Sequence, residues 1–279
     1  MCGIFGAIGH NISAGTIRAL ALVNRERGTD SLGFFSSSGK FVKRAGDPLG
    51  CLGDIDFGDF IDKSCHKGWF VAGHTRQATY GRVSSKNAHP FRYGRIIGAH
   101  NGCVTFPKDR NYRVDSEYLF DSLSAAEGDY QRALADISGY WGLTWFDGES
   151  FYLQAHNNEI ALGRDKRGTW YYSSDWTHLE ACVRITDHFT LLNNGGTIRF
   201  NIKCGTFERL PDFRSNVGAT IGFLLEDSRG DRKGRKRRKH KRGTQAARME
   251  ELNTDPFYFD EDEKWAGVDH WSEYIREYN

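Results

Sequence analysis

Long hydrophobic runs are missing from this sequence of 279 residues, which contains no stretch of 18 consecutive apolar residues. A membrane-spanning helix needs about 20 such residues, so none is expected. The N-terminus also lacks a basic region followed by an apolar segment, the pattern of a secretory signal peptide. These absences predict a cytoplasmic protein without a membrane partner.

Closely spaced cysteines are missing as well. The six cysteines stand at positions 2, 51, 65, 103, 182 and 204, and none forms a Cys-x-x-Cys pair. Structural zinc sites and disulfide-rich small domains depend on such spacing. We therefore expect reduced thiols and no metal site, and no cofactor is expected.

Charge is nearly balanced overall, with a formal net charge of +2, but it is distributed unevenly. Residues 229–242 contain ten Lys or Arg and one Asp, whereas residues 243–279 contain ten Asp or Glu and three Lys or Arg. We expect a globular domain in 1–226 and a basic then acidic C-terminal tail in 227–279 that is partly disordered. The basic stretch from Arg232 to Arg242 is either a solvated linker or a contact for nucleic acid.

Short apolar or alternating runs recur through the first 225 residues, and Gly, Asp or Asn bounds most of them. They predict strands at 3–8, 33–36, 69–73, 96–100, 142–146, 151–155, 169–173, 197–200 and 220–225. Helical spacing predicts helices at 13–25, with Ser13 as a cap, and at 115–125, 129–137 and 176–184. Many strands with few helices favour an α+β fold of stacked sheets covered by helices.

The N-terminal stretch MCGIFG places Cys2 directly before a glycine-punctuated apolar run. Cysteine is common in buried strands, so one interpretation is purely structural. The other follows from removal of Met1, which would leave Cys2 with a free α-amine whose usual pKa is about 7.7–8.0. That amine can act as the base for the thiol of the same residue, which would make Cys2 a nucleophile.

Two charged residues, Arg76 and Asp115, stand at the ends of predicted secondary-structure elements, where binding sites often form. Arg76 comes after the apolar run WFVAG, and its fork of donors matches a carboxylate, although a surface salt bridge is the alternative. Asp115 opens a helix, where it either caps the helix or pairs with a substrate ammonium group. The two charges together suit a free amino acid.

Asn101 and Gly102 end an apolar run in the stretch IIGAHNGCVTF. Asn-Gly is typical of a hairpin turn. The same pair can instead direct a side-chain amide and a backbone N–H at one point, which is the arrangement of an oxyanion hole.

Six stretches in collinear order resemble the class II glutamine amidotransferases of the N-terminal-nucleophile hydrolase superfamily. They are MCGIFG at 1–6, RGTDSLG at 27–33, GHTRQAT at 73–79, NAHPF at 87–91, HNG at 100–102 and DSE at 115–117. The stretch YYSSDWTHL at 171–179 is similar to the one that closes the family's glutaminase domain. The resemblance implies a four-layer αββα sandwich.

The resemblance also implies a mechanism. Cys2 would attack the side-chain carboxamide of glutamine to form a γ-glutamyl thioester, with Asn101 and Gly102 as oxyanion donors. The residues implied to bind L-glutamine are Arg76, Thr79, Asp115 and Gly102. Arg27 and Gly28 would belong to the supporting loop beside the nucleophile.

Two positions depart from the family's pattern. Gln77 stands where the family often has Trp, and Tyr80 stands where it often has His. In the family that Trp commonly covers the glutamine site and the exit of ammonia, so the resemblance does not show which residue closes that exit here. His74 and His89 are expected to be structural, because the family's pattern does not use them as catalytic bases.

The family's well-known members carry a synthase domain of several hundred residues after the glutaminase domain, and here only about 50 residues, rich in charge, follow. They contain no ATP-binding loop of the Gly-x-x-x-x-Gly-Lys-Ser/Thr type. We expect a stand-alone glutaminase that supplies ammonia to an acceptor enzyme in trans. The alternatives are an inactive binding protein tethered to nucleic acid by its basic tail, and an amidase for another substrate.

Overall fold

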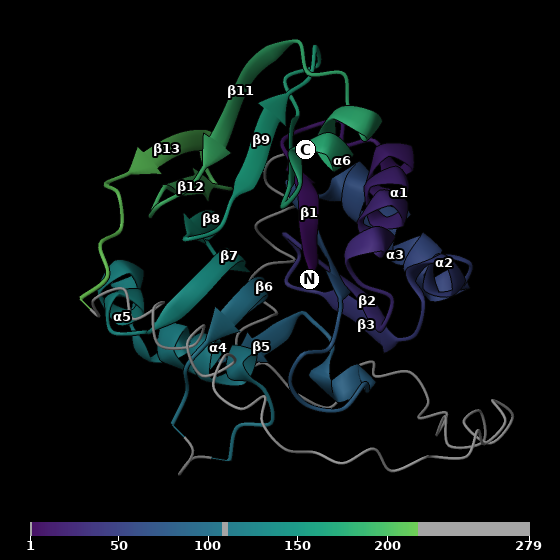
Figure 1. The fold of residues 1–279 in the computed structure, drawn as a ribbon. Helices are drawn as coiled ribbons and strands as arrows, with labels where there is room; N and C mark the ends of the chain where they lie inside the picture. Colours follow the sequence, from purple (N-terminus) through teal and green to yellow (C-terminus); the bar gives the residue numbers. More distant parts are fainter. Residues whose placement is uncertain (1, 108–110, 217–279) are drawn as a thin grey trace, which may run out of the picture.

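A computed structural model describes residues 2–107 and 111–216, and in this part of the chain two antiparallel sheets are stacked face to face (Figure 1). The first sheet has the strand order β11 (Asp187–Leu192), β9 (Ile160–Arg164), β10 (Trp170–Ser173), β1 (Gly3–Ile8), β4 (Phe70–Arg76), β2 (Ser31–Ser36) and β3 (Phe41–Ala45). The second has the order β13 (Thr206–Leu210), β12 (Thr197–Asn201), β8 (Ser150–His156), β7 (Gly139–Phe146), β6 (Ile96–Val104) and β5 (Phe91–Tyr93).

Helices cover the outer face of each sheet (Figure 1). The first sheet is covered by α1 (Ala14–Val23), α2 (Pro48–Leu52), α3 (Ile55–Lys67) and α6 (Trp176–Cys182), and the second by α4 (Asp115–Ala125) and α5 (Tyr130–Ala135). Short 3-10 helices occupy Asn24–Arg27 and Ser85–Asn87. This arrangement confirms the predicted four-layer αββα sandwich.

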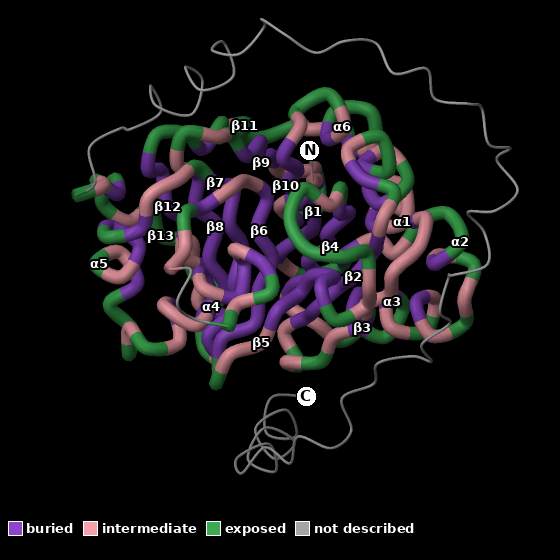
Figure 2. The backbone as a smooth tube through the Cα atoms, turned by 60° about the horizontal axis from the view of Figure 1, so that its bottom comes forward, coloured by how far each residue is buried: buried purple, intermediate pink, exposed green. Residues whose placement is uncertain are grey.

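Three apolar layers result from this stacking. Between the sheets, the ring of Phe70 on β4 lies 5.1 Å from that of Phe146 on β7 and 4.4 Å from that of Phe151 on β8. Outer layers separate each sheet from its helices, with Phe57 and Ile61 of α3 fully buried in one of them. The central strands are buried along most of their length (Figure 2), and close packing on both faces fixes the position of their backbone.

Several local predictions are confirmed, and others need correction. Ser13 caps α1 by accepting the Thr16 N–H at 3.2 Å, as predicted. Helix α3 was missed, although its buried Phe57, Ile61 and Cys65 repeat at helical spacing, because charged residues and Gly58 dilute the pattern. The short element α2 and strands β3, β5, β9, β11 and β13 were also not predicted.

Two interpretations of the sequence are wrong, one of a hairpin turn and one of a helix cap. The Asn101-Gly102 pair lies inside the long strand β6 and does not form a hairpin turn. The N-cap of α4 is Val114, so Asp115 is the first helical residue and does not cap the helix.

Predictions for the C-terminal region lie outside the described residues. These are the strand at 220–225, the domain boundary at 226, the tail at 227–279 and the basic stretch Arg232–Arg242.

Candidate functional site

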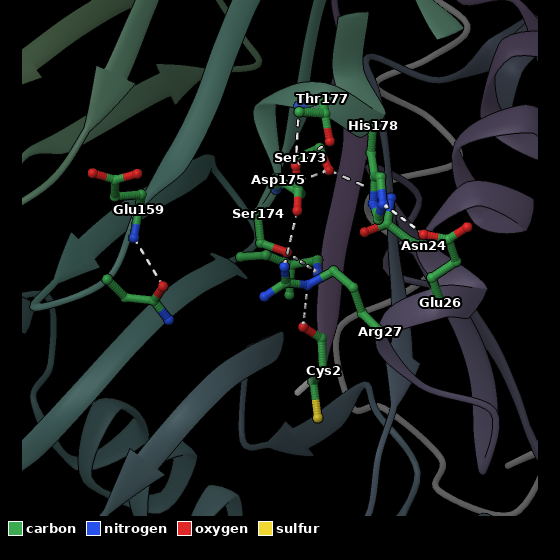
Figure 3. A network of polar contacts seen from close by, with 12 residues as sticks. Cys2, Asn24, Glu26, Arg27, Glu159, Ser173, Ser174, Asp175, Thr177 and His178 are labelled. Carbon is green, nitrogen blue, oxygen red and sulfur yellow. Dashed lines mark hydrogen bonds and ion pairs between the residues drawn. The ribbon is translucent and has the colours of Figure 1, made fainter. Parts of the chain in front are cut away.

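Cys2 lies directly before β1, the central strand of the first sheet, and two groups hold the backbone there. Arg27 donates from Nε to the Cys2 carbonyl at 2.9 Å, and its Nη1 reaches Asp175 at 3.2 Å (Figure 3). Ser174 holds Ile4, two residues after Cys2: its Oγ accepts the Ile4 N–H at 3.1 Å, and its own N–H donates to the Ile4 carbonyl at 2.8 Å. The position of Cys2 is therefore set from both the Arg27 loop and the start of α6.

The Cys2 thiol sits 3.6 Å from the Gln77 carbonyl oxygen, and protein atoms crowd it although the residue is partly exposed. Burial raises the pKa of this thiol; the Arg76 charge opposes that shift and the Asp115 charge adds to it. Charges from β4 and from α4 thus act on the same sulfur atom. A raised thiol pKa means that a nearby base is needed to generate the thiolate at neutral pH.

Arg76 ends β4 and is only 5% exposed, so the surface salt bridge considered for it is wrong. Its guanidinium donates to the carbonyls of Tyr80 at 2.5 Å and Arg82 at 3.3 Å. Asp30 holds the chain after Arg76, since its carboxylate accepts the Ala78 N–H at 2.7 Å. Arg76 and Asp30 together fix the loop that follows β4.

Gly28 approaches this loop more closely than any other residue type can. A Cβ at position 28 would lie 2.3 Å from the Arg76 carbonyl carbon and 2.6 Å from the Gln77 nitrogen. Both are backbone atoms that cannot rotate away. The requirement for glycine in the supporting loop therefore comes from this contact.

We expect Gly28→Ala to lower the midpoint of thermal unfolding, because the added methyl group must displace the Arg76–Gln77 peptide. Overpacking of this kind typically costs about 1–3 kcal/mol. Thermal denaturation measures the effect. Gly50→Ala is the matched control, because nothing lies within 4 Å of a Cβ there; equal behaviour of the two variants would contradict the prediction.

Asn101 and Gly102 lie on β6, in the second sheet, where β6 packs against β1. Asn101 is 4% exposed. Gly102 has φ of +159°, and a Cβ there would lie 2.1 Å from the Tyr140 carbonyl oxygen on β7. The close approach of β7 explains why glycine follows Asn101.

Asp115 joins the end of β6 to the start of α4. Its carboxylate accepts the N–H of Val104 at 3.1 Å and of Ser116 at 3.0 Å. Asp115 is only partly buried, so its carboxylate is fixed by backbone donors while part of the residue remains accessible. Thr79, in contrast, is exposed in the loop after β4, and the structure does not bring it into the hydrogen-bonded network around Cys2.

The two departures from the family's pattern lie in the same loop. The Gln77 side chain is exposed and donates to Asp30 at 3.4 Å. Tyr80 is 56% exposed, and its ring meets that of Phe106 edge to face at 6.0 Å.

Three buried histidines lie between the sheets. His74 contacts the His100 carbonyl through Nε2 at 3.1 Å, while His89 and His100 both contact Ser116 Oγ, at 3.0 and 3.1 Å. Burial lowers the pKa of His74 to about 3 and that of His89 and His100 below the usual value. These rings are neutral at pH 7, and they link β4, β6 and α4 behind Asp115.

We expect the free energy of unfolding to fall as pH decreases from 6.5 toward 4. In the unfolded chain these histidines bind protons as the pH falls through about 6.5, whereas in the folded chain their lowered pKa values keep them neutral. Their contribution to the free energy of unfolding is therefore fully present above about pH 6.5 and decreases below it. Each extra proton contributes a slope of about 1.4 kcal/mol per pH unit. Denaturant titrations should show a smaller slope for His89→Asn and an unchanged slope for His66→Asn, whose side chain is exposed; identical slopes would contradict this account.

Sequence reasoning missed several residues that position this site. Asp30 lies inside the RGTDSLG stretch and was not singled out, and Asp175 lies inside YYSSDWTHL. Asn158 donates to the Asn101 carbonyl at 3.0 Å, and no pattern in the sequence marks it.

Beyond the candidate site, the described structure contains a cavity, but it offers neither a metal-binding group nor a helix that could span a membrane. A cavity of about 250 Å³ lies on the helix-covered side of the second sheet, lined by Tyr130, Trp145 and Tyr152 among others, and none of the candidate site residues lines it. Within 2–107 and 111–216, no group of three or more His, Cys, Asp or Glu could hold a metal ion. None of the helices in these ranges is long and apolar enough to cross a membrane.

The chain is similar to isomerizing glutamine–fructose-6-phosphate aminotransferases. It is 28% identical over 240 residues to the enzyme of Gluconobacter oxydans (strain 621H), covering 70% of this chain and 37% of that one. It is 35% identical over 219 residues to the enzyme of Streptococcus pyogenes serotype M6, covering 68% and 34%. The chain thus spans about a third of the length of these relatives. No family model matches it.

The fold is similar to that of glutamine phosphoribosylpyrophosphate amidotransferase from B. subtilis, complexed with ADP and GMP. The TM-score is 0.59 at 18% sequence identity, and the match covers 77% of this chain and 50% of that chain. At this identity the likeness concerns the fold alone. The sequence relatives place the chain among the class II glutamine amidotransferases, and the fold neighbour agrees with them in fold.

Proposed function

We propose that this protein hydrolyses L-glutamine to glutamate and ammonia through a thioester on Cys2. The observation that carries the proposal is the position of the Cys2 thiol, whose Sγ lies 3.6 Å from the carbonyl oxygen of Gln77, the residue that follows Arg76. The charges of Arg76, from β4, and of Asp115, from α4, both act on the pKa of this thiol. Glutamine carries an α-carboxylate and an α-ammonium group, so this pair of charges complements a free amino acid next to a nucleophile.

Substrate binding is assigned to the residues around these charges. Arg76 uses two of its side-chain nitrogens to hold the loop at Tyr80 and Arg82, and its remaining donors would bind the α-carboxylate. Asp115 would accept from the α-ammonium group. The proposal also assigns Thr79 and Gly102 to the wall of the substrate site, where binding would have to draw the exposed Thr79 inward.

The protein would first be processed by removal of Met1, which exposes the α-amine of Cys2. The amine takes the thiol proton, directly or through a water, and the sulfur attacks the carboxamide carbon. Asn101 and Gly102 would donate hydrogen bonds to the oxyanion of the tetrahedral intermediate. The C–N bond then breaks, and the amine proton leaves with the nitrogen as ammonia. Water cleaves the resulting thioester, which releases glutamate and restores the thiol.

We further propose that the ammonia is consumed by an acceptor enzyme in trans. This chain corresponds to about a third of its relatives' length, so an acceptor activity would have to lie elsewhere. Residues 1–226 would form the glutaminase domain, and 227–279 would contact the partner, with nucleic acid bound through Arg232–Arg242 as the competing role.

The boundary is tested by ending the chain at residue 226. We expect kcat for glutamine hydrolysis to stay within about twofold of the full chain, because every residue placed in or around the site, up to Asp175, precedes the boundary at residue 226. A glutaminase assay on both forms measures this. Loss of hydrolysis in the shortened chain would place the tail inside the catalytic domain.

The proposed activity is tested by intact mass after treatment with 6-diazo-5-oxo-norleucine, which alkylates nucleophiles of this type. The expected result is loss of Met1, one adduct on Cys2, and glutamate release from glutamine. Cys204 is the internal control: it is exposed, and its hydrogen bond with Thr206 lowers the thiol pKa, so a nonspecific reagent would label it first. A processed protein without a Cys2 adduct or hydrolysis would contradict the proposal.

A further inference from the structure

The connection between β8 and β9 passes from the second sheet to the first at the end where Cys2 and Asn101 lie. His156 at the end of β8 pairs with Trp141, the partner of Gly102 in β7. On the other side of the connection, Ala161 of β9 pairs with Ser173, which in turn pairs with Phe5 of β1. Asn158 therefore lies in the connection that joins the sheet of the oxyanion candidates to the sheet of the nucleophile.

Both ends of the Asn158 amide are engaged. Nδ2 donates to the Asn101 carbonyl at 3.0 Å, and Oδ1 accepts the Glu159 N–H at 2.9 Å; Figure 3 draws this second bond at Glu159. Reversing the amide would place two donors together and two acceptors together. The orientation with the NH₂ group toward Asn101 is therefore the only one that satisfies both contacts.

The Asn101 carbonyl belongs to the same peptide group as the Gly102 N–H. In a trans peptide these two bonds are coplanar and point in opposite directions, so a donor that fixes the carbonyl also fixes the direction of the N–H. A hydrogen bond to the carbonyl polarises the peptide as well, which strengthens its N–H as a donor.

The strand register shows which way that N–H points. The β6–β7 ladder is unbroken, and Thr105 donates to Ser138 at 2.8 Å, so alternate residues, including Asn101, direct their backbone groups toward β7. The Gly102 N–H then points to the opposite edge of β6. There β5 pairs only with Ile96–Gly98, so within the described residues no strand occupies that edge at Gly102.

We propose that Asn158 is a positioning residue for the oxyanion hole, acting through the Asn101–Gly102 peptide. This inference rests on the proposed glutaminase function. Asn158 does not touch the substrate; it holds the peptide plane at the angle from which the Gly102 N–H meets the developing negative charge.

The test compares Asn158→Ala and the isosteric Asn158→Asp, which cannot donate at neutral pH, with the neighbouring control Glu159→Ala. We expect kcat for glutamine hydrolysis to fall about 10- to 100-fold in both Asn158 variants, with KM changed less than threefold, because the misaligned donor acts mainly in the transition state. Glu159→Ala should retain wild-type kcat, since its backbone N–H remains and its side chain is exposed.

A second readout separates positioning from general damage. Alkylation of Cys2 by iodoacetamide, followed by peptide mass, forms no acyl oxyanion, so its rate should be unchanged in both Asn158 variants while kcat falls. Equal loss of kcat and of alkylation rate, or wild-type kcat in Asn158→Ala, would overturn the inference. An inactive wild-type protein would instead refute the proposed function itself.

Discussion

Cys2→Ala is expected to lower glutamine hydrolysis by at least about 10³-fold, the largest single effect in this protein, because the variant lacks the atom that forms the thioester. Stability should change little. The hydrogen bond of the sulfur to the Gln77 carbonyl is long, at 3.6 Å, and the backbone bonds to Arg27 and Ser174 do not depend on the side chain. Glutamate release and thermal unfolding measure the two quantities.

The control for this variant is Cys182→Ala, which removes a partly buried thiol at the end of α6 outside the site. It should hydrolyse glutamine at the wild-type rate. Hydrolysis that survives in Cys2→Ala, or that disappears in Cys182→Ala as well, would be incompatible with Cys2 as the nucleophile.

Asn101→Ala is the second large effect, with an expected loss of about 10²–10³-fold in kcat. Removing one oxyanion donor in comparable enzymes costs about 2.7–4 kcal/mol of transition-state stabilisation. The KM for glutamine should move much less, because the ground-state carboxamide carries less charge on its oxygen than the intermediate does. Steady-state kinetics with glutamine separates the two parameters.

Asn193→Ala serves as the matched control, because Asn193 is exposed in the β11–β12 connection, away from β6. A raised KM with unchanged kcat in Asn101→Ala would make Asn101 a substrate-binding residue. Unfolding midpoints must accompany the kinetics, because Asn101 is buried and its truncation leaves a small cavity.

The relation between Asn101 and Asn158 extends this prediction. Asn101 is proposed to contribute its side-chain amide, whereas Asn158 acts on the main-chain carbonyl of the same residue. The two act on separate donors of one oxyanion hole. Their effects on kcat are therefore expected to combine in the double variant, and a double variant no slower than Asn101→Ala would contradict a separate contribution of Asn158.

Much of the fold followed from local patterns. Apolar runs at β1, β4, β7 and β8 are long enough and well enough bounded to be recognised, and Ser13 marks the start of α1. Elements with diluted patterns, such as α3 and the edge strands β3 and β13, were not recognised because their stability comes from packing and pairing rather than from local preference. The assigned roles of the site residues remain predictions.

Residue type and spacing were enough to identify the chemical groups of the candidate site and their order along the chain: a thiol at Cys2, a guanidinium at Arg76, the Asn101-Gly102 pair and a carboxylate at Asp115. Covalent structure and short-range preference are written locally, so spacing and residue type carry them. The contacts that hold these groups are set by the folded arrangement of the chain: the Arg27 bond to the Cys2 carbonyl, the Gly28 contact with Arg76, and the Asn158 bond to the Asn101 carbonyl. Such contacts join segments tens of residues apart, and they depend on strand register and sheet stacking, which no local pattern specifies.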